Sequence, residues 1–232
     1  MAIAHLRFYE ELNDFLPPAR RKVEFEHRFD RRTSIKDMIE SLGVPHPEVE
    51  LILVNGRSVD FSHIVADGDR ISVYPVFESL DVSSLIRLRD APLRESRFVV
   101  DCNLGRLARY LRLLGLDCLY QNDFNDETVS RISQQQRRIV LTRDRRLLHR
   151  KIITHGLYVR AVDPREQVKE VLQRLDLHGA VQPFTRCTRC NGLLKTISKQ
   201  TVDHRLEPKT RRYYHHFLQC GQCGQVLSLI HI

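Results

Sequence analysis

Residues 98–120, FVVDCNLGRLARYLRLLGLDCLY, decide the fold of the middle of the chain. A short apolar run precedes a helix whose leucines form one stripe, and Gly115 ends that helix before a second apolar run, CLY. The alternation continues through DETVSRISQQQ, RIVLT, RDRRLLHRKI, LYVRAV and PREQVKEVLQRL. Strands that alternate with helices imply right-handed crossovers, so residues 97–178 are predicted to form an α/β domain around a parallel sheet.

Three acidic residues follow these predicted strands or begin the helices after them: Asp101, Asp126 and Asp144. Ligands of open α/β sheets gather at the carboxyl ends of the strands. Carboxylates that converge there repel one another unless a cation joins them, so the pattern favours a divalent metal site. Asp123 and Glu127 are candidates for a further ligand. Each aspartate could simply cap a helix, but three at strand ends in one domain favour a shared site.

Positive charge is concentrated in the second part of the chain. Residues 1–80 hold 10 Lys and Arg against 14 Asp and Glu, whereas residues 81–232 hold 27 against 15. This asymmetry favours a polyanionic partner, such as nucleic acid, over helices with merely solvated arginines. Four arginines are candidate phosphate contacts, three at every third position of the first helix and one beside Asp144: Arg106, Arg109, Arg112 and Arg143.

Residues 1–79 carry a different pattern. Alternation at AHLRFY and KVEFEHRF predicts two strands, Ser34 begins a helix, and ELILVNGRSV and DRISVYPV predict further strands. This order resembles a ubiquitin-like β-grasp domain of the kind found in small sulfur carriers. Those carriers act through a free Gly-Gly terminus, whereas this segment runs on into more protein, so we expect a docking or folding module. Residues 80–96 are polar and irregular and are predicted to be a linker.

Four of the six cysteines form two pairs in FTRCTRCNGLLK and FLQCGQCGQVL: Cys187 with Cys190, and Cys220 with Cys223. Each pair is followed by Gly or Asn-Gly, which suits the tight backbone around a metal-bound sulfur. Two similar pairs favour a structural Zn²⁺ site over redox use of either pair, so a zinc ribbon is predicted over residues 180–226. Between the pairs, EPKTRRYYHHF could grip RNA or form an ordinary strand with a basic edge.

The two ends of the chain carry little functional signal. The last six residues, LSLIHI (227–232), match a reading-frame translation of a transposon-end sequencing adapter, so we expect an artefactual tail and do not count His231 as a ligand. The start lacks a basic region followed by an apolar run, and no window approaches the roughly 18 apolar residues of a membrane helix. These features and the paired cysteines favour a cytoplasmic protein without a membrane partner.

The run FVVDCNLGRLARYLRLLGLDCLY, followed by NDFNDE and IVLTRDRRLL, resembles the PIN-like ribonuclease domain at the C-terminus of the Mut-seven exonuclease. Prokaryotic relatives of that domain often carry an N-terminal ubiquitin-like β-grasp domain and a C-terminal zinc ribbon. The resemblance covers essentially the whole chain. It implies a three-layer PIN-like α/β domain and a Mg²⁺- or Mn²⁺-dependent ribonuclease whose clustered acids correspond to Asp101, Asp126, Asp144 and Asp123.

Two other functions stay open at this stage. A non-catalytic RNA-binding or adaptor protein would use the same basic surface without bringing the aspartates to one ion. A toxin-like nuclease would be held by a protein partner, with the β-grasp segment as the docking element. The residues do not distinguish endonuclease from exonuclease action or identify the RNA target.

Overall fold

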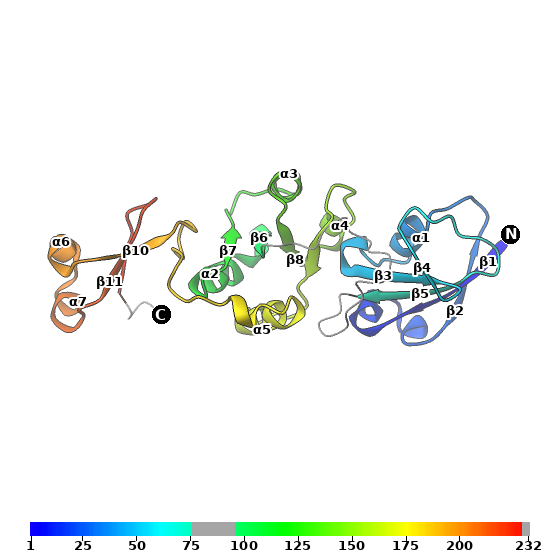
Figure 1. Ribbon diagram of the computed structural model, residues 1–232, viewed down its shortest axis with the longest axis horizontal. Helices are drawn as coiled ribbons and strands as arrows, with labels where there is room; N and C mark the ends of the chain where they lie inside the picture. The colour runs from blue at the N-terminus through cyan, green and yellow to red at the C-terminus, as the bar shows by residue number, and fades with distance from the viewer. Residues whose placement is uncertain (76–95, 229–232) are drawn as a thin grey trace.

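The computed structural model describes residues 1–75 and 96–228, which form three modules in a row along the long axis (Figure 1). The N-terminal module is a sheet with one covering helix, the central module is a sheet between helices, and the C-terminal module is a small antiparallel sheet. The predicted linker, residues 80–96, lies outside the described residues except for Ser96.

The N-terminal module has the strand order β2-β1-β5-β3-β4, in which β1 and β5 run parallel and the other pairs antiparallel. Its elements are β1 (Ala2–Phe8), β2 (Phe25–Phe29), α1 (Ile35–Ser41), β3 (Val49–Val54), β4 (Arg57–Val59) and β5 (Arg70–Pro75), with 3-10 turns at Glu10–Phe15, Pro18–Arg20 and His46–Glu48. Ser34 caps α1, because its hydroxyl oxygen accepts the Asp37 N–H at 3.1 Å. The predicted ubiquitin-like β-grasp fold is confirmed.

The central module is a parallel sheet in the order β7-β6-β8-β9, as far as the described residues go. Its elements are β6 (Arg97–Val100), a 3-10 turn (Cys102–Leu104), α2 (Gly105–Leu113), β7 (Asp117–Leu119), α3 (Asp126–Gln136), β8 (Ile139–Thr142), α4 (Arg145–Leu148), β9 (Gly156–Tyr158) and α5 (Pro164–Arg174). The predicted alternation of strands and helices and the parallel sheet are confirmed.

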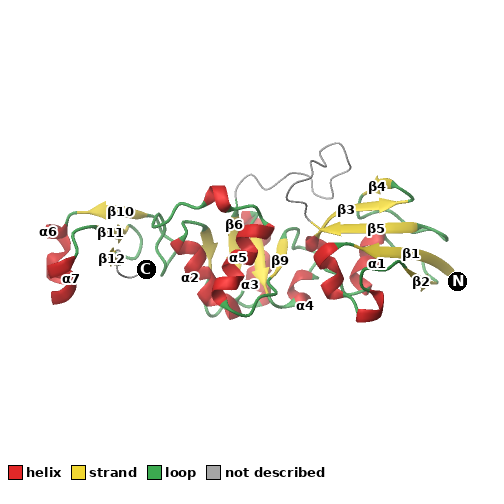
Figure 2. Cartoon of the chain, turned by 90° about the horizontal axis from the view of Figure 1, so that it is seen from below, coloured by secondary structure: helices red, strands yellow, loops and turns green. Residues whose placement is uncertain are grey.

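Alternate residues of the central strands face two separate cores, which gives the module three layers. Figure 1 shows α3 and α5 on opposite sides of the sheet, and Figure 2 looks onto the side that α2 and α5 cover. Phe98 and Val100 pack with the apolar stripe of α2 and with α5 on one side. Val99 and Val140 pack on the other side with apolar residues from α3 and α4. Successive side chains of a strand point to opposite faces, so a strand buried on both faces needs the unbroken apolar run seen here.

The C-terminal module is an antiparallel sheet in the order β10-β11-β12. Its elements are a 3-10 turn (His178–Ala180), β10 (Leu194–Ile197), α6 (Lys199–Val202), a 3-10 turn (Asp203–Arg205), α7 (Pro208–Tyr213), β11 (Phe217–Cys220) and β12 (Val226–Ser228). Most of EPKTRRYYHHF forms α7, so the strand alternative for this segment is wrong. Leu227 and Ser228 of the expected tail belong to β12, and residues 229–232 lie outside the described residues.

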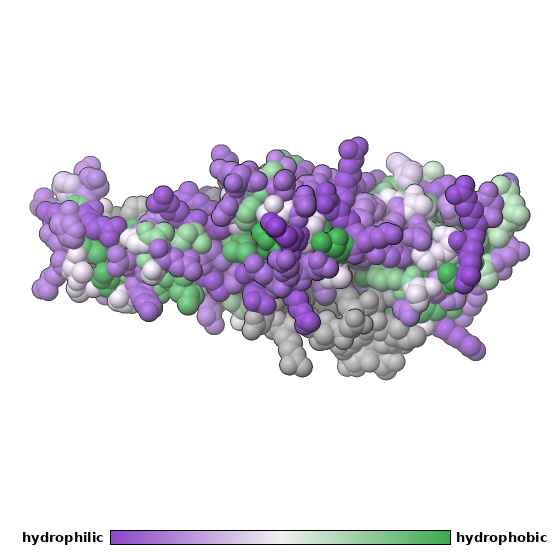
Figure 3. Space-filling view, turned by 90° about the horizontal axis from the view of Figure 1, so that it is seen from above, coloured by the Kyte–Doolittle hydropathy of each residue, from purple (hydrophilic) through white to green (hydrophobic). Residues whose placement is uncertain are grey.

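The surface seen in Figure 3 is mainly hydrophilic along the whole length, with small separate apolar patches. Within the described ranges, no helix is long and apolar enough to cross a membrane.

Candidate active site and metal site

The acidic residues were expected at the carboxyl ends of β6 and β8, the position of the ligand crevice in open α/β sheets. From β6 the chain passes through α2 to β7 on one side, and then through α3 to β8 on the other side of β6. Such a switch point is where open α/β sheets bind ligands. Asp101 follows β6 directly, and Asp144 lies two residues after the end of β8. The structure therefore brings two of the predicted acids to one crevice.

Thr142 links Asp101 to Asp144. Its hydroxyl donates to Asp101 Oδ2 at 2.7 Å, and the same oxygen accepts the backbone N–H of Asp144 at 2.8 Å. Asp101 and Thr142 are both buried. Asp144 also caps α4, because its Oδ1 accepts the N–H of Arg146 at 2.8 Å. The sequence pattern did not single out Thr142. A threonine at the end of the apolar strand IVLT, two residues before Asp144, could have indicated its role.

Asp126 lies at the start of α3, but it is not the cap. The side chain of Asn125 caps this helix by accepting the Thr128 N–H at 2.9 Å, so the Asp126 carboxylate is available for another role. That carboxylate is 47% exposed and lies 3.9 Å from the Arg150 guanidinium.

Asp126 and Asp101 act on a common neighbour, the Cys102 thiol. Burial raises the pKa of this thiol, and the two carboxylates raise it further, with Asp101 contributing more than Asp126. Asp123 and Glu127 are exposed in the loop after β7 and on α3. In the part of the chain that the structure describes, the acids do not form a group of three with ligand atoms within 4.8 Å.

Arg106 and Arg109 are exposed on α2 and line a cavity of about 500 Å³. Asn103, two residues after Asp101, lines the same cavity, as does Tyr120 after β7. Two of the predicted phosphate contacts therefore border a hollow that also contains Asn103, close in sequence to Asp101.

Arg112 has a different role from the one predicted. Its side chain is buried, and its guanidinium donates to the carbonyl oxygens of Cys118 at 2.8 Å and of Arg189 at 2.9 Å, and burial lowers its pKa. Three residues advance a helix by about 300°, so Arg112 lies about 120° around α2 from Arg106. Arg112 therefore does not lie on the exposed surface that Arg106 and Arg109 share.

Arg143 holds the chain after β9. Its Nη1 donates to the carbonyl oxygen of Arg160 at 2.7 Å and also to that of Ala161. This nitrogen is therefore engaged by the protein, in the turn that contains Asp144. The phosphate contact expected of Arg143 stays a prediction.

The four paired cysteines converge on one point. Their sulfur atoms all lie within 4.8 Å of one another, with 3.7 Å between Cys187 and Cys223 and 3.4 Å between Cys190 and Cys220. Four sulfurs about 2.3 Å from a central ion would be about 3.8 Å apart, so the spacing fits one tetrahedral metal ion. All six cysteines lie within the described ranges and are free thiols.

Backbone N–H groups support the sulfur of Cys220. Those of Gln222 and Cys223 point at it from 3.4 and 3.5 Å. Burial raises the pKa of Cys220, but these donors and the neighbouring thiols outweigh burial and bring it to about 7. A thiol that ionises near neutral pH is a suitable metal ligand, because the thiolate is the form that binds.

The first cysteine knuckle docks on the outer edge of β7 through Asn191. The side-chain oxygen of Asn191 accepts the Cys118 N–H at 3.0 Å, and its amide nitrogen donates to Asp117 Oδ1 at 2.8 Å. Arg138 and Arg186 pair with the same Asp117 carboxylate at 2.7 and 3.2 Å. The sequence had indicated only a tight backbone at this Asn-Gly pair.

The N-terminal module docks on the outer edge of β9 through Glu48. One carboxylate oxygen of this buried residue accepts the Tyr158 N–H, and the other accepts from Arg174 at 2.7 Å. Close by, His46 Nε2 lies 2.8 Å from the carbonyl oxygen of Ile153. The module is therefore joined to the rest of the chain by buried polar contacts, as a docking or folding element would be.

Together, these features define an α/β protein with a ubiquitin-like domain before the central sheet and, after it, a group of four cysteines that could hold a metal ion. The chain belongs to the Mut7-C family: the model of the Mut7-C RNAse domain matches residues 96–227, and that of the Mut7-C ubiquitin domain matches residues 1–81. No curated protein and no solved structure matches the chain. The family predicted from the sequence is confirmed.

Proposed function

We propose that the protein is a divalent-metal-dependent ribonuclease that hydrolyses RNA phosphodiester bonds at the carboxyl ends of β6 and β8. The observation that carries the proposal is the buried Asp101, joined through Thr142 to Asp144, in a chain with an RNase-family domain. Within residues 1–75 and 96–228, no basic side chain forms an ion pair with Asp101. A buried carboxylate without a cationic partner is costly, so a bound cation is its natural complement.

The oxygen donors fit Mg²⁺ or Mn²⁺, which prefer carboxylate and water ligands. Thr142 fixes Oδ2 of Asp101, and the α4 cap fixes Oδ1 of Asp144, so the second oxygen of each carboxylate would be the one that binds the metal. The more exposed Asp126 and Asp123 would supply further carboxylates. When bound, the metal would polarise the scissile phosphate and activate a water molecule.

Arg106 and Arg109 would hold the RNA backbone in the cavity beside the crevice, because both are exposed and lie close to Asn103. Arg112 and the Nη1 of Arg143 would keep the surrounding chain in position rather than contact RNA. We also propose that the four cysteines hold a structural Zn²⁺, since a complete set of four thiolates leaves no open coordination position for chemistry.

The test is cleavage of a fluorescent single-stranded RNA by the purified full chain with Mg²⁺ or Mn²⁺. Asp101→Asn and Asp144→Asn should each lower the rate by about 100-fold or more, the scale of losing one electrostatic group from an active site. Asp163→Asn is the matched control, because Asp163 caps α5 in the same way and is not one of the proposed metal ligands.

A non-catalytic RNA-binding protein is the second candidate, favoured because the acids of the described residues do not form a group of three placed to hold a metal ion. If this candidate is correct, the protein binds RNA but does not cleave it in the presence of a metal ion, and the wild type and both aspartate variants bind RNA equally well. If Asp101→Asn and Asp144→Asn still cleave RNA at the wild-type rate, the active site lies elsewhere in the protein.

A further inference from the structure

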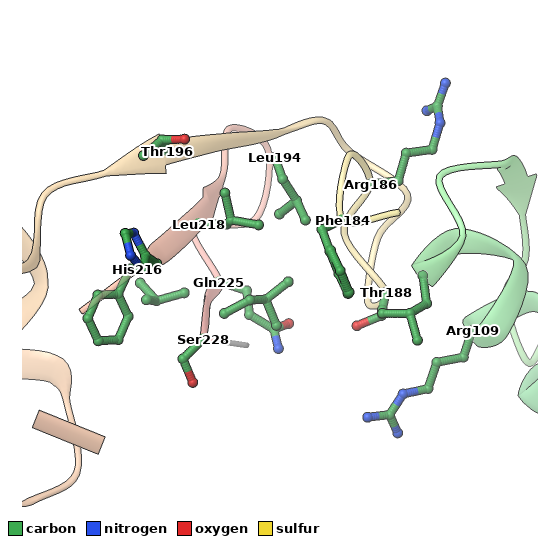
Figure 4. Close-up of a pocket in the computed structure, with 14 residues that line it drawn as sticks. Arg109, Phe184, Arg186, Thr188, Leu194, Thr196, His216, Leu218, Gln225 and Ser228 are labelled. Carbon is green, nitrogen blue, oxygen red and sulfur yellow. The ribbon is translucent and has the colours of Figure 1, made fainter. Parts of the chain in front are cut away.

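A second cavity, of about 260 Å³, lies between α2 and the C-terminal module (Figure 4). Its lining comes from α2, from residues 184–188 ahead of β10, and from all three strands of the C-terminal sheet. Its volume is close to the lower end of pockets that hold small ligands, about 300 Å³. A cavity of this size suits a single nucleotide and excludes a duplex.

Phe184 is the aromatic side chain that Figure 4 shows extending into this cavity. Its backbone has φ 64°, and its N–H donates to the carbonyl oxygen of Leu113 at 3.0 Å, which ties it to the end of α2. Gly115 allows this close approach, because a Cβ there would lie 2.0 Å from the carbonyl oxygen of Gln182. The ring is half-buried, and among the described residues it has no aromatic partner.

Arg109 joins this cavity to the one beside the acidic crevice, because it lines both. Figure 4 shows its side chain leaving α2 along the side of the pocket. The guanidinium is exposed and has no hydrogen-bond or ion-pair partner among the residues that the structure describes. An extended ligand could therefore pass from the crevice, past one free positive charge, into the second cavity.

The charge around the second cavity suits a polyanion. Residues 180–228 hold 8 Lys and Arg against 2 Asp and Glu, and neither acid lines the cavity. His216 lies at the opposite side of the pocket from Arg109 (Figure 4). Two arginines line the cavity: Arg186 is paired with Asp117 at 3.2 Å, whereas Arg109 has no such partner among the described residues. An aromatic ring beside a cationic side chain is an arrangement that binds single-stranded nucleic acids, since every base offers a flat face for stacking.

We propose that this pocket binds a nucleotide of the single-stranded RNA substrate outside the cleaved bond, with its base against Phe184 and an adjoining phosphate at Arg109. The C-terminal module then takes part in substrate binding in addition to holding a metal ion. The proposal rests on the proposed function for its choice of RNA as ligand, but it concerns a pocket that none of the proposed acidic residues lines.

The experiment measures binding of a fluorescent single-stranded RNA to the full, zinc-loaded chain, with Ca²⁺ in place of Mg²⁺ to suppress cleavage. Phe184→Ala should weaken binding by about 10-fold, within the range for one lost base stack, whereas Phe184→Tyr should stay within about twofold of wild type. Leu193→Ala is the matched control, because Leu193 is an exposed apolar residue of the same module that does not line the pocket.

Zinc content and thermal unfolding accompany each variant, and Phe184→Leu replaces the alanine variant if that one does not fold. Equal binding by the wild type and the folded Phe184 variant, or a larger loss in Leu193→Ala, would overturn the proposal. This outcome differs from failure of the proposed function, in which cleavage is absent or does not depend on Asp101 and Asp144. In Mg²⁺, Phe184→Ala should raise KM for a long RNA and leave kcat unchanged.

Discussion

The two outer edges of the central sheet are covered in the same way but with different chemistry. On β7, a neutral amide, that of Asn191, accepts the Cys118 N–H. On β9, a charged carboxylate, that of Glu48, accepts the Tyr158 N–H. Exposed strand edges invite pairing with other chains, and each edge here is covered by a side chain from a neighbouring module.

The difference lies in what keeps each side chain in place. Asn191 directly follows Cys190, and its N–H donates to the carbonyl oxygen of Cys187 at 2.9 Å, so its position depends on the cysteine cluster. Glu48 is held by Arg174 at 2.7 Å and Arg160 at 3.6 Å, and needs no metal. The β7 edge should therefore respond to metal and the β9 edge to charge.

Removing the metal site should have the largest effect and should be confined to the β7 edge. Cys187→Ser removes one of four ligands, and structural zinc sites of this kind contribute most of the folding energy of a small module. Hydrogen exchange should accelerate strongly at residues 117–119 and stay at the wild-type rate at residues 156–158. Equal acceleration at both strands would show that the two edges are not independent.

Glu48→Ala should destabilise the protein by about 3 kcal/mol, because removing one partner of a buried ion pair leaves the other uncompensated. Glu11, 3.0 Å from Arg174, limits the loss. Urea unfolding measures the change, and Glu26→Ala, which removes the same charge from an exposed position of β2, is the control. A loss no larger than that of the control would mean that Glu48 is not needed on β9.

Asn191→Gly should cost about 1–2 kcal/mol, the scale of leaving one buried N–H without an acceptor. Glycine isolates the effect of the side chain, because Asn191 has φ 69° and any other replacement would add backbone strain. The measurement is urea unfolding with exchange at the Cys118 amide. Loss of zinc from this variant would instead show that Asn191 stabilises the cysteine site itself.

Acid should weaken the β7 edge by a smaller amount. Burial raises the pKa of Asp117, but its bonds to Arg138 and Asn191 outweigh burial and lower the pKa below the ordinary value of 3.8. Because the pKa of Asp117 is lower in the folded state than in the unfolded state, its charged form stabilises the protein at pH values above the unfolded-state pKa. This stabilisation is lost as the pH falls through the folded-state pKa. The free energy of unfolding of Asp117→Asn should therefore vary less below about pH 4 than that of the wild type, which an acid titration measures.

The sequence predicted the central sheet and the place of its acids because both follow from local patterns. LGRLARYLRLLG marks a helix after a strand, and that order alone puts Asp101 at a carboxyl end. Arg112 could not be assigned so simply, because its carbonyl partners on residues 188 and 189 are brought near only by the tertiary fold. Pro208 did signal the start of α7, since proline favours the first turn of a helix.

The contacts of Glu48 and Asn191 could not be predicted from the sequence, for the same reason. Glu48 is buried by contacts with residues 110 and 126 positions further along the chain, and no local pattern distinguishes it from an exposed glutamate. Sequence spacing identified the elements, while the contacts that join the modules required the structure.

The contact between Glu48 and Tyr158 also sets an order of events during synthesis. The two residues are 110 positions apart, so a ribosome adding about 5–20 residues per second makes Tyr158 roughly 5–20 s after Glu48. Throughout that interval the Glu48 carboxylate stays hydrated in the nascent chain. Asn191 is made later still, so the growing protein can cover the β9 side of its sheet first and the β7 side last.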